Sequence, residues 1–293
     1  MSSRVTIYDL LQDGRDDDIA VSGIERSALS YRELRSQVER TVAALNNLGI
    51  GRNDRVAIVL PNGPEMATAF VSIGSCATTA PLNPAYTREE FDFYLSDLGA
   101  TALVVEQGAD SAAVAAARDR EIQVFELCAD QGQPAGTFTL AAETSSRSTA
   151  AHGGLAEPAD VALVLHTSGT TSRPKIVPLS HANVCASARN IQSTLRLEPA
   201  DVCLNVMPLF HIHGLIAAVL ATLGKGASVF AAPGFDALRF FGWLDEAQPT
   251  WYTAVPTMHQ AILGRSRRNR EIIERSKLRF IRSSSSSLPP QVL

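Results

Sequence analysis

The chain has few of the features that mark secreted, membrane-spanning or metal-binding proteins. Its four cysteines are scattered over 293 residues without a Cys-x-x-Cys pair, which argues against a disulfide framework or a zinc site and favours a reducing compartment. The N-terminus has no basic segment followed by an apolar one, so no secretory leader is expected. The apolar stretch from Gly214 to Gly224 ends at Lys225 and is too short to span a bilayer. We therefore expect a soluble, cytoplasmic protein.

A strong charge of one sign is also missing. The net charge of −4 gives no general attraction to nucleic acid or to anionic membranes. A basic run from Arg265 to Arg282 is interrupted by Glu271 and Glu274, so we interpret it as the solvated face of a helix. Neither nucleic acid nor a membrane is expected as a partner, and the oligomeric state stays open.

What the chain does contain is enough apolar residues, 45%, to bury a large core. Apolar runs alternate with amphipathic helical patterns, and capping boxes open two of the helices, at Ser30 and at Thr87. Such alternation predicts an α/β fold of βαβ units, with layered sheets and helices on their faces. The predicted elements are helices over 30–49 and 184–195 and strands over 56–60, 101–105, 161–165 and 202–206.

We expect two lobes. The first spans residues 1–160, and the second spans residues 161–293. Residues 129–158 are rich in Gly, Ser, Thr and Ala and are predicted to connect them.

Residues 167–175, Thr-Ser-Gly-Thr-Thr-Ser-Arg-Pro-Lys, follow a predicted buried strand. Their hydroxyls can donate hydrogen bonds, Gly169 lets the backbone approach a ligand, and Lys175 adds a positive charge, a combination that suits phosphate oxygens. The segment is not a Walker A loop, because Lys175 follows Pro174 and leads into an extended tail before Pro178. By composition alone, a solvated Ser/Thr turn fits equally well.

A second group of polar residues follows the strand over 202–206. On an extended backbone, His211 and His213 would project from the same face, and Gly214 would leave space beside them. Such a pair could bind a metal or an anion. No third ligand is evident nearby, so a pair lining a pocket is favoured over a metal site.

The run Ser283 to Ser287 comes directly after a strand-like segment, Leu278 to Ile281. It could be a flexible linker. Its position beside a buried strand instead favours a site, where five hydroxyls and Arg282 would make a polar wall able to bond a carboxylate.

In order, these segments resemble the motifs of the adenylate-forming superfamily, which includes acyl-CoA synthetases, luciferases and peptide-synthetase adenylation domains. The phosphate-binding signature matches 167–175, the next motif matches Met207 to Gly214, and a third matches Ala254 to Thr257. Arg279 to Leu288 occupies the place of the family's Ser-Gly-Gly-Ala-Pro segment. The combination is most similar to oxalate CoA ligases and 4-coumarate CoA ligase-like synthetases.

The chain departs from the family pattern at several points. Ser172 and Ile176 stand where glycine is usual. The sequence also stops at Leu293, before the family's Tyr-Gly-x-Thr-Glu motif, its ribose-binding Asp and its C-terminal lid domain. The resemblance therefore covers a truncated large N-terminal domain, and by resemblance the metal-binding Glu and the adenylation Lys lie outside it.

The resemblance implies an ATP-dependent acid–CoA ligase that uses ATP, Mg²⁺ and coenzyme A on a small polar acid such as oxalate. The alternative is a truncated nucleotide-binding fragment without turnover. Catalytic roles fall to Lys175 and His211, and no residue of this chain is assigned to a metal. The resemblance places the phosphates at Thr167, Ser168, Gly169, Thr170, Thr171 and Lys175, and the acyl and adenine pocket at His211, His213, Arg282, Ser283, Ser284, Ser285, Ser286 and Ser287.

Overall fold

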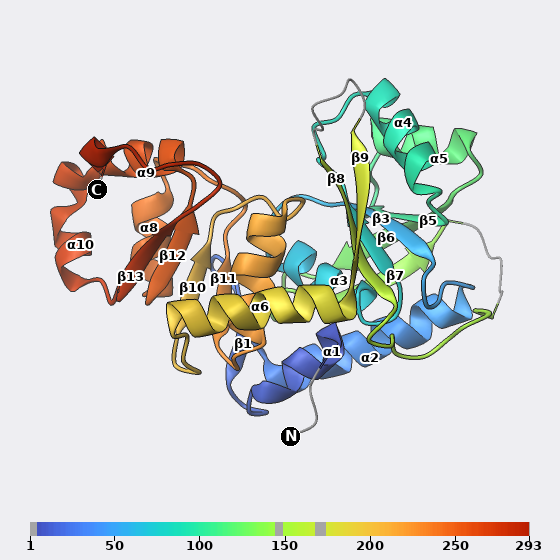
Figure 1. Ribbon diagram of the computed structural model, residues 1–293, viewed down its shortest axis with the longest axis horizontal. Helices are drawn as coiled ribbons and strands as arrows, with labels where there is room; N and C mark the ends of the chain where they lie inside the picture. Colours follow the sequence, from blue (N-terminus) through green and yellow to red (C-terminus); the bar gives the residue numbers. More distant parts are fainter. Residues whose placement is uncertain (1–4, 144–148, 168–173, 293) are drawn as a thin grey trace.

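The structure, a computed structural model, describes residues 5–143, 149–167 and 174–292 and is built on two β-sheets (Figure 1). The order of the six-stranded sheet is β13-β12-β10-β11-β1-β2, and that of the seven-stranded sheet is β7-β6-β5-β3-β4-β8-β9. Pairs β1–β2, β6–β7 and β8–β9 are antiparallel and the others are parallel. The strands are β1 (Ile19–Ser22), β2 (Leu29–Ser30), β3 (Arg55–Val59), β4 (Thr78–Pro81), β5 (Ala102–Glu106), β6 (Gln123–Ala129), β7 (Phe138–Ala142), β8 (Val161–Thr167), β9 (Lys175–Ser180), β10 (Val202–Asn205), β11 (Ser228–Ala231), β12 (Trp251–Ala254) and β13 (Phe280–Ser283).

Helices fill the space between the sheets and cover their outer faces. Between the sheets, α3 contacts β4 on one side and β1 and β11 on the other, and its residues from Met66 to Ile73 are all buried. Helices α4 and α5 pack on the outer face of the seven-stranded sheet, and α8 packs on that of the six-stranded sheet. The helices are α1 (Ile7–Leu10), α2 (Tyr31–Asn47), α3 (Pro64–Ile73), α4 (Arg88–Leu98), α5 (Ala112–Asp119), α6 (His181–Leu195), a π-helical segment (His213–Leu220) continued by α7 (Ala221–Leu223), α8 (Phe240–Ala247), α9 (Pro256–Leu263) and α10 (Arg270–Arg275).

The predicted α/β fold is confirmed, and so are its best-marked elements. Both capping boxes form, because the Ser30 and Thr87 hydroxyls each accept an N–H three residues on and the Glu at that position bonds back. The strands predicted at 56–60 and 101–105 form within one residue of the expected bounds. Among the described residues, no helix is long and apolar enough to cross a membrane.

The expected division at residue 160 does not match the sheets. Strands β1 and β2, from the start of the chain, join the six-stranded sheet, whereas β8 and β9 join the seven-stranded one. The reason is that β8 pairs with β4, and the hydroxyls of Thr78 and Thr79 donate to its carbonyls at Val161 and Ala162, each at 2.7 Å. The two lobes therefore exchange segments of sequence.

The segment over 129–158, which was predicted to be a connection, also contains a strand. This strand is β7, which pairs with β6 in antiparallel fashion, with Phe138 opposite Ala129. Phe138 is buried, while the residues after it alternate between exposure and partial burial. Such a weakly apolar edge strand resembles a loop in composition.

Candidate functional site

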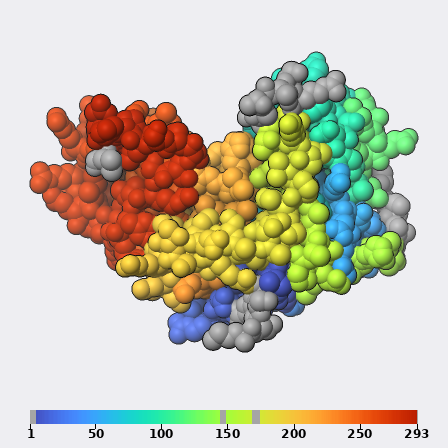
Figure 2. All heavy atoms as spheres, viewed as in Figure 1, coloured from blue at the N-terminus to red at the C-terminus, as the bar shows by residue number. Residues whose placement is uncertain are grey.

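A cavity of about 540 Å³ lies between the two sheets. Figure 2 shows the hollow above it, between the C-terminal region in red and strand β9 in yellow-green. One wall comes from the seven-stranded sheet and the segments beside it, and the other from the segments that follow β10 and β13. The polar and aromatic residues that line it are Asn83, Tyr86, Tyr94, His166, Thr167, Phe210, His211, His213 and Ser285.

Of the segment 167–175, which is predicted to bind phosphate, the structure describes Thr167, Pro174 and Lys175. Thr167 ends β8 and lies directly opposite Lys175, the first residue of β9, and the Thr167 hydroxyl donates to the Lys175 carbonyl at 3.5 Å. Lys175 is exposed and forms no ion pair with any described residue. Its side chain does not line the cavity, whereas Thr167 does. The other predicted phosphate ligands, at positions 168–171, lie outside the described residues.

His211 and His213 both line the cavity, but the backbone between them is not extended as expected. Ile212 has φ −51° and ψ −32°, so the chain turns into the π-helical segment at this point. His211 stays exposed on the turn, beside the ring of Phe210 at 4.6 Å between centroids. His213 is buried as the first residue of the helix. π-Helical segments recur at functional sites.

His213 belongs to a compact hydrogen-bonded group with Thr253 and Arg282. Thr253 and Arg282 are opposite each other in the parallel pair β12–β13, so their side chains share a face. The His213 Nε2 atom lies 2.6 Å from Thr253 Oγ1 and 2.9 Å from Arg282 Nη1, which also donates to Thr253 Oγ1 at 3.0 Å. Because a guanidinium can only donate, we assign the hydrogen of His213 to Nδ1, which faces the Ser285 hydroxyl at 3.3 Å.

The charge in this group belongs to arginine. Burial, together with the nearby Arg282 guanidinium, lowers the pKa of His213 to about 4, so the imidazole is neutral at physiological pH. Burial also lowers the pKa of Arg282, although arginine starts high enough to stay protonated. Within the described residues, no carboxylate forms an ion pair with Arg282. A half-buried cation without an acidic partner is suited to an anionic ligand.

The serine run divides between two surfaces. The Ser284 hydroxyl accepts a hydrogen bond from Arg282 Nη2 at 3.2 Å, and Ser285 lines the cavity with φ +74°. That left-handed conformation is uncommon for residues other than glycine and is typical of strained positions at sites. Ser283 instead faces the opposite side of β13, because side chains alternate along a strand. Ser286 and Ser287 are exposed, and no contact places them in the cavity.

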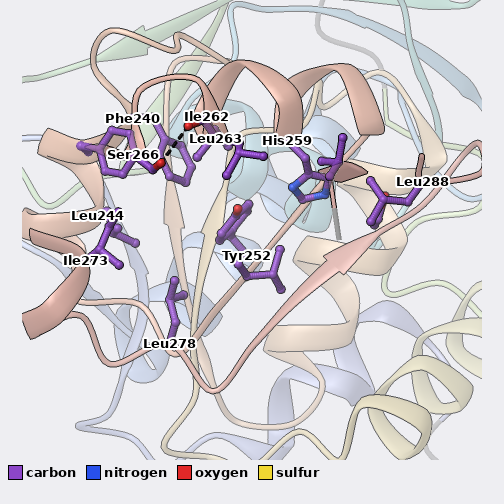
Figure 3. Close-up of a pocket in the computed structure, with 14 residues that line it drawn as sticks. Phe240, Leu244, Tyr252, His259, Ile262, Leu263, Ser266, Ile273, Leu278 and Leu288 are labelled. Carbon is purple, nitrogen blue, oxygen red and sulfur yellow. Dashed lines mark hydrogen bonds between the residues drawn. The ribbon is translucent and has the colours of Figure 1, made fainter. Parts of the chain in front are cut away.

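A second, apolar cavity of about 300 Å³ lies on that opposite side (Figure 3). Phe240, Leu244 and Tyr252 line it together with Leu288 near the end of the chain. Its polar content is low, and the hydroxyl of Ser283 has no partner there among the described residues. We call it the apolar groove. The polar cavity is the better candidate site, because the hydroxyls, imidazoles and unpaired cation gather there.

Sequence reasoning missed some residues of the site. Thr253 was not predicted as a site residue. A threonine within the buried run Trp251–Ala254 does indicate a hydrogen-bond partner in the interior, because buried hydroxyls are nearly always hydrogen-bonded. Tyr86 and Tyr94, whose rings stack at 4.7 Å, come from a region read only for its capping box. His166, beside Tyr94, accompanies Thr167 at the end of β8, and its Nε2 atom lies 3.1 Å from Asp97 Oδ2.

Known proteins are similar to this chain in sequence and in fold. The profile of a family described as AMP-binding enzyme matches residues 12–293. A probable CoA ligase of Humulus lupulus, CCL9, is 39% identical over 305 residues, covering 100% of this chain and 57% of that protein. An oxalate–CoA ligase of Arabidopsis thaliana is 42% identical over 280 residues, covering 94% of this chain and 54% of that protein. ATP-bound MatB from Rhodopseudomonas palustris has a TM-score of 0.82 and 26% identity, over 99% of this chain and 56% of MatB. The chain spans about half the length of the relatives it matches.

Proposed function

The chain belongs to the AMP-binding enzyme family, and on that premise we propose that it carries the acid-activating site of an ATP-dependent acid–CoA ligase. The acid is small and polar, with oxalate as the leading candidate. One observation carries the proposal: a cavity that joins the end of β8, where the phosphate signature begins, to the group of His213, Thr253 and Arg282. The support from relatives is an oxalate–CoA ligase at 42% identity.

The proposed reaction has two steps. A carboxylate oxygen of the acid attacks the α-phosphorus of ATP, and the bond to pyrophosphate breaks. The thiol sulfur of coenzyme A then attacks the carbonyl carbon, AMP leaves, and the thiol proton is lost. The first step brings an anion to a polyanion, so the site must supply positive charge and hydrogen-bond donors where negative charge develops.

The described residues supply groups of both kinds. The Lys175 ammonium forms no ion pair with a described residue and can pair with phosphate oxygens, and the Thr167 hydroxyl at the end of β8 can donate to them. We propose that Ser168, Gly169, Thr170 and Thr171 complete this phosphate site. The proposed Mg²⁺ would neutralise phosphate charge, and we assign no described residue to hold it.

The acid would occupy the space beside His211, His213 and Ser285. We propose that His211, on the exposed turn, orients the reacting carboxylate. The polar wall of His213 and Ser285, with the Arg282 charge one hydrogen bond behind it, then favours a second carboxylate over an apolar tail. This is the physical basis for preferring oxalate to a fatty or aromatic acid. The four free cysteines fit a cytoplasmic location, which we also propose.

Calorimetric titration of the purified chain with MgATP, alone and with oxalate, tests the proposal when paired with a coupled assay for pyrophosphate. The proposal predicts saturable MgATP binding and oxalate binding that strengthens when the nucleotide is present. Oxalate-dependent release of pyrophosphate would establish the first step in this chain. Binding without release would identify a nucleotide-binding half-site without turnover. Absence of binding to both ligands would overturn the proposal.

A further inference from the structure

One side-chain amide joins the two sheets next to the cavity. Asn62 lies just after β3 of the seven-stranded sheet. Its Nδ2 group donates to the carbonyl of Met207 at 3.0 Å and to that of Ala232 at 3.4 Å, and its Oδ1 atom accepts the N–H of Leu209 at 2.7 Å. Met207 follows β10, and Ala232 follows β11, both in the six-stranded sheet. The carboxyl ends of strands from both sheets therefore meet at Asn62.

The backbone groups that Asn62 holds belong to the turn that presents His211. Met207 and Leu209 lie just before it, and the His211 N–H donates to the carbonyl of Pro208 at 3.3 Å. The same carbonyl is packed against Gly214, where a Cβ atom would approach it to 2.5 Å. The turn is thus held from outside by the amide of Asn62, and its inner side is closed against a residue that must be glycine.

The placement of this turn decides the shape of the cavity. His211 and Met207 line one wall, and Thr167, at the end of β8, lines the other. Strand β8 pairs with β4, which pairs with β3, so Asn62 is anchored to the same sheet as the Thr167 wall. No other side chain in the described residues hydrogen-bonds to both Met207 and Leu209.

We infer that Asn62 is a positioning residue that fixes the His211 turn of one sheet relative to the Thr167 wall of the other, and so sets the width of the acid-binding cavity. The role in acid binding rests on the proposed function. The fixing of the turn does not, because it can be measured without substrate.

The test compares Asn62→Ala with a matched control, Asn46→Ala. Asn46 makes the same kind of contacts far along the chain from the turn: its Nδ2 group donates to the Ile50 carbonyl at 3.0 Å, and its Oδ1 atom accepts the Gly154 N–H at 2.6 Å. Both variants lose an amide that bonds to the backbone, and only one of them releases the turn. Asn62→Asp is a second variant. It keeps an acceptor for Leu209, but it cannot donate to Met207.

Two readouts follow the turn itself. In Asn62→Ala, the amide hydrogen of Leu209 should exchange about tenfold faster, the scale of one lost hydrogen bond. Modification of His211 by diethylpyrocarbonate should change severalfold, measured against free N-acetylhistidine in the same reaction. Asn46→Ala should leave both rates at wild-type values. Equal rates in the two variants would overturn the inference, and if Asn62→Ala does not fold, Asn62→Asp is judged by the same criteria.

A third readout links the turn to the acid. Asn62→Ala should weaken oxalate binding in the presence of MgATP about tenfold while leaving the affinity for MgATP alone within twofold. A released turn with unchanged oxalate affinity would overturn the role in acid binding. If the wild-type chain binds no oxalate, the proposed function fails, and the exchange and modification rates still decide whether Asn62 holds the turn.

Discussion

On one face of β12 and β13 lie Thr253 and Arg282, and on the other lie Tyr252, Ile281 and Ser283. The first face carries a hydrogen-bonded polar group beside the cavity, and the second forms the floor of the apolar groove. Neighbouring residues of two strands thus build two surfaces with opposite chemistry. The comparison shows that two paired strands can separate a polar cavity from an apolar one.

Removing the charge of Arg282 should produce the largest difference in oxalate affinity between variants of the two faces. Arg282→Met should weaken oxalate binding by about 3 kcal/mol, because a charged donor is lost from behind the polar wall. Calorimetry with oxalate and MgATP measures the change. Ile281→Ala, on the neighbouring residue that faces the groove, is the matched control and should leave affinity unchanged. Similar losses in both variants would show that the faces do not differ in function.

The next prediction compares nucleotide binding with acid binding through Lys175, at the proposed phosphate site. Lys175→Ala should weaken binding of MgATP or pyrophosphate by roughly 1.5 to 3 kcal/mol, the scale of a hydrogen bond to a charged group. Its effect on oxalate in the absence of nucleotide should be small. Titrations with pyrophosphate alone and with oxalate alone separate the two. Unchanged pyrophosphate binding in a folded variant would refute the phosphate role.

The burial of His213 should make the free energy of unfolding sensitive to acid. The pKa of His213 is about 4 in the folded chain, below its ordinary value of 6.5, so the unfolded chain takes up a proton first as pH falls. The stability that this group contributes is full above pH 6.5 and is lost between 6.5 and 4. In urea unfolding, His213 should account for a loss of about 1 to 2 kcal/mol between pH 7 and pH 5, and His213→Gln should remove that share. The share of His181, whose pKa burial also lowers to about 4, should stay in both chains. An identical pH dependence in the variant would contradict the assignment.

The smallest expected effect concerns the serines. Ser284→Ala removes the hydroxyl that accepts from Arg282, so it should lower the preference for oxalate over acetate a fewfold, by less than about 1 kcal/mol. Ser286→Ala, at an exposed position, is the control and should change nothing. Competition between the two acids measures the ratio. An equal shift in both variants would mean that hydroxyl content, rather than contact with Arg282, sets selectivity.

Local patterns in the sequence were enough for many elements of the fold. The capping boxes at Ser30 and Thr87 predict helix starts because donor and acceptor lie within four residues of each other. The exchange of segments between lobes could not be predicted in this way. It depends on β8 pairing with β4, about eighty residues earlier, and a buried apolar strand fits either sheet.

Contacts between residues far apart in the sequence also limited the prediction of the site. The residue types at 211, 213 and 282–287 indicated a polar pocket, but strand alternation decides which of them can face it, and that turned Ser283 toward the groove. The bond between His213 and Arg282 joins residues 69 positions apart, and Thr253 completes it from a third element. The sequence around Asn62 does not indicate its role, because its partners lie about 145 residues away.

The most direct test of the account follows both faces in one NMR titration of the wild-type chain with oxalate in the presence of MgATP. The ring resonances of His213 report on the cavity, and the methyl resonances of Ile281 report on the apolar groove. The account predicts that the His213 signals shift with saturation while the Ile281 signals stay in place. Saturable shifts at Ile281 with none at His213 would contradict it.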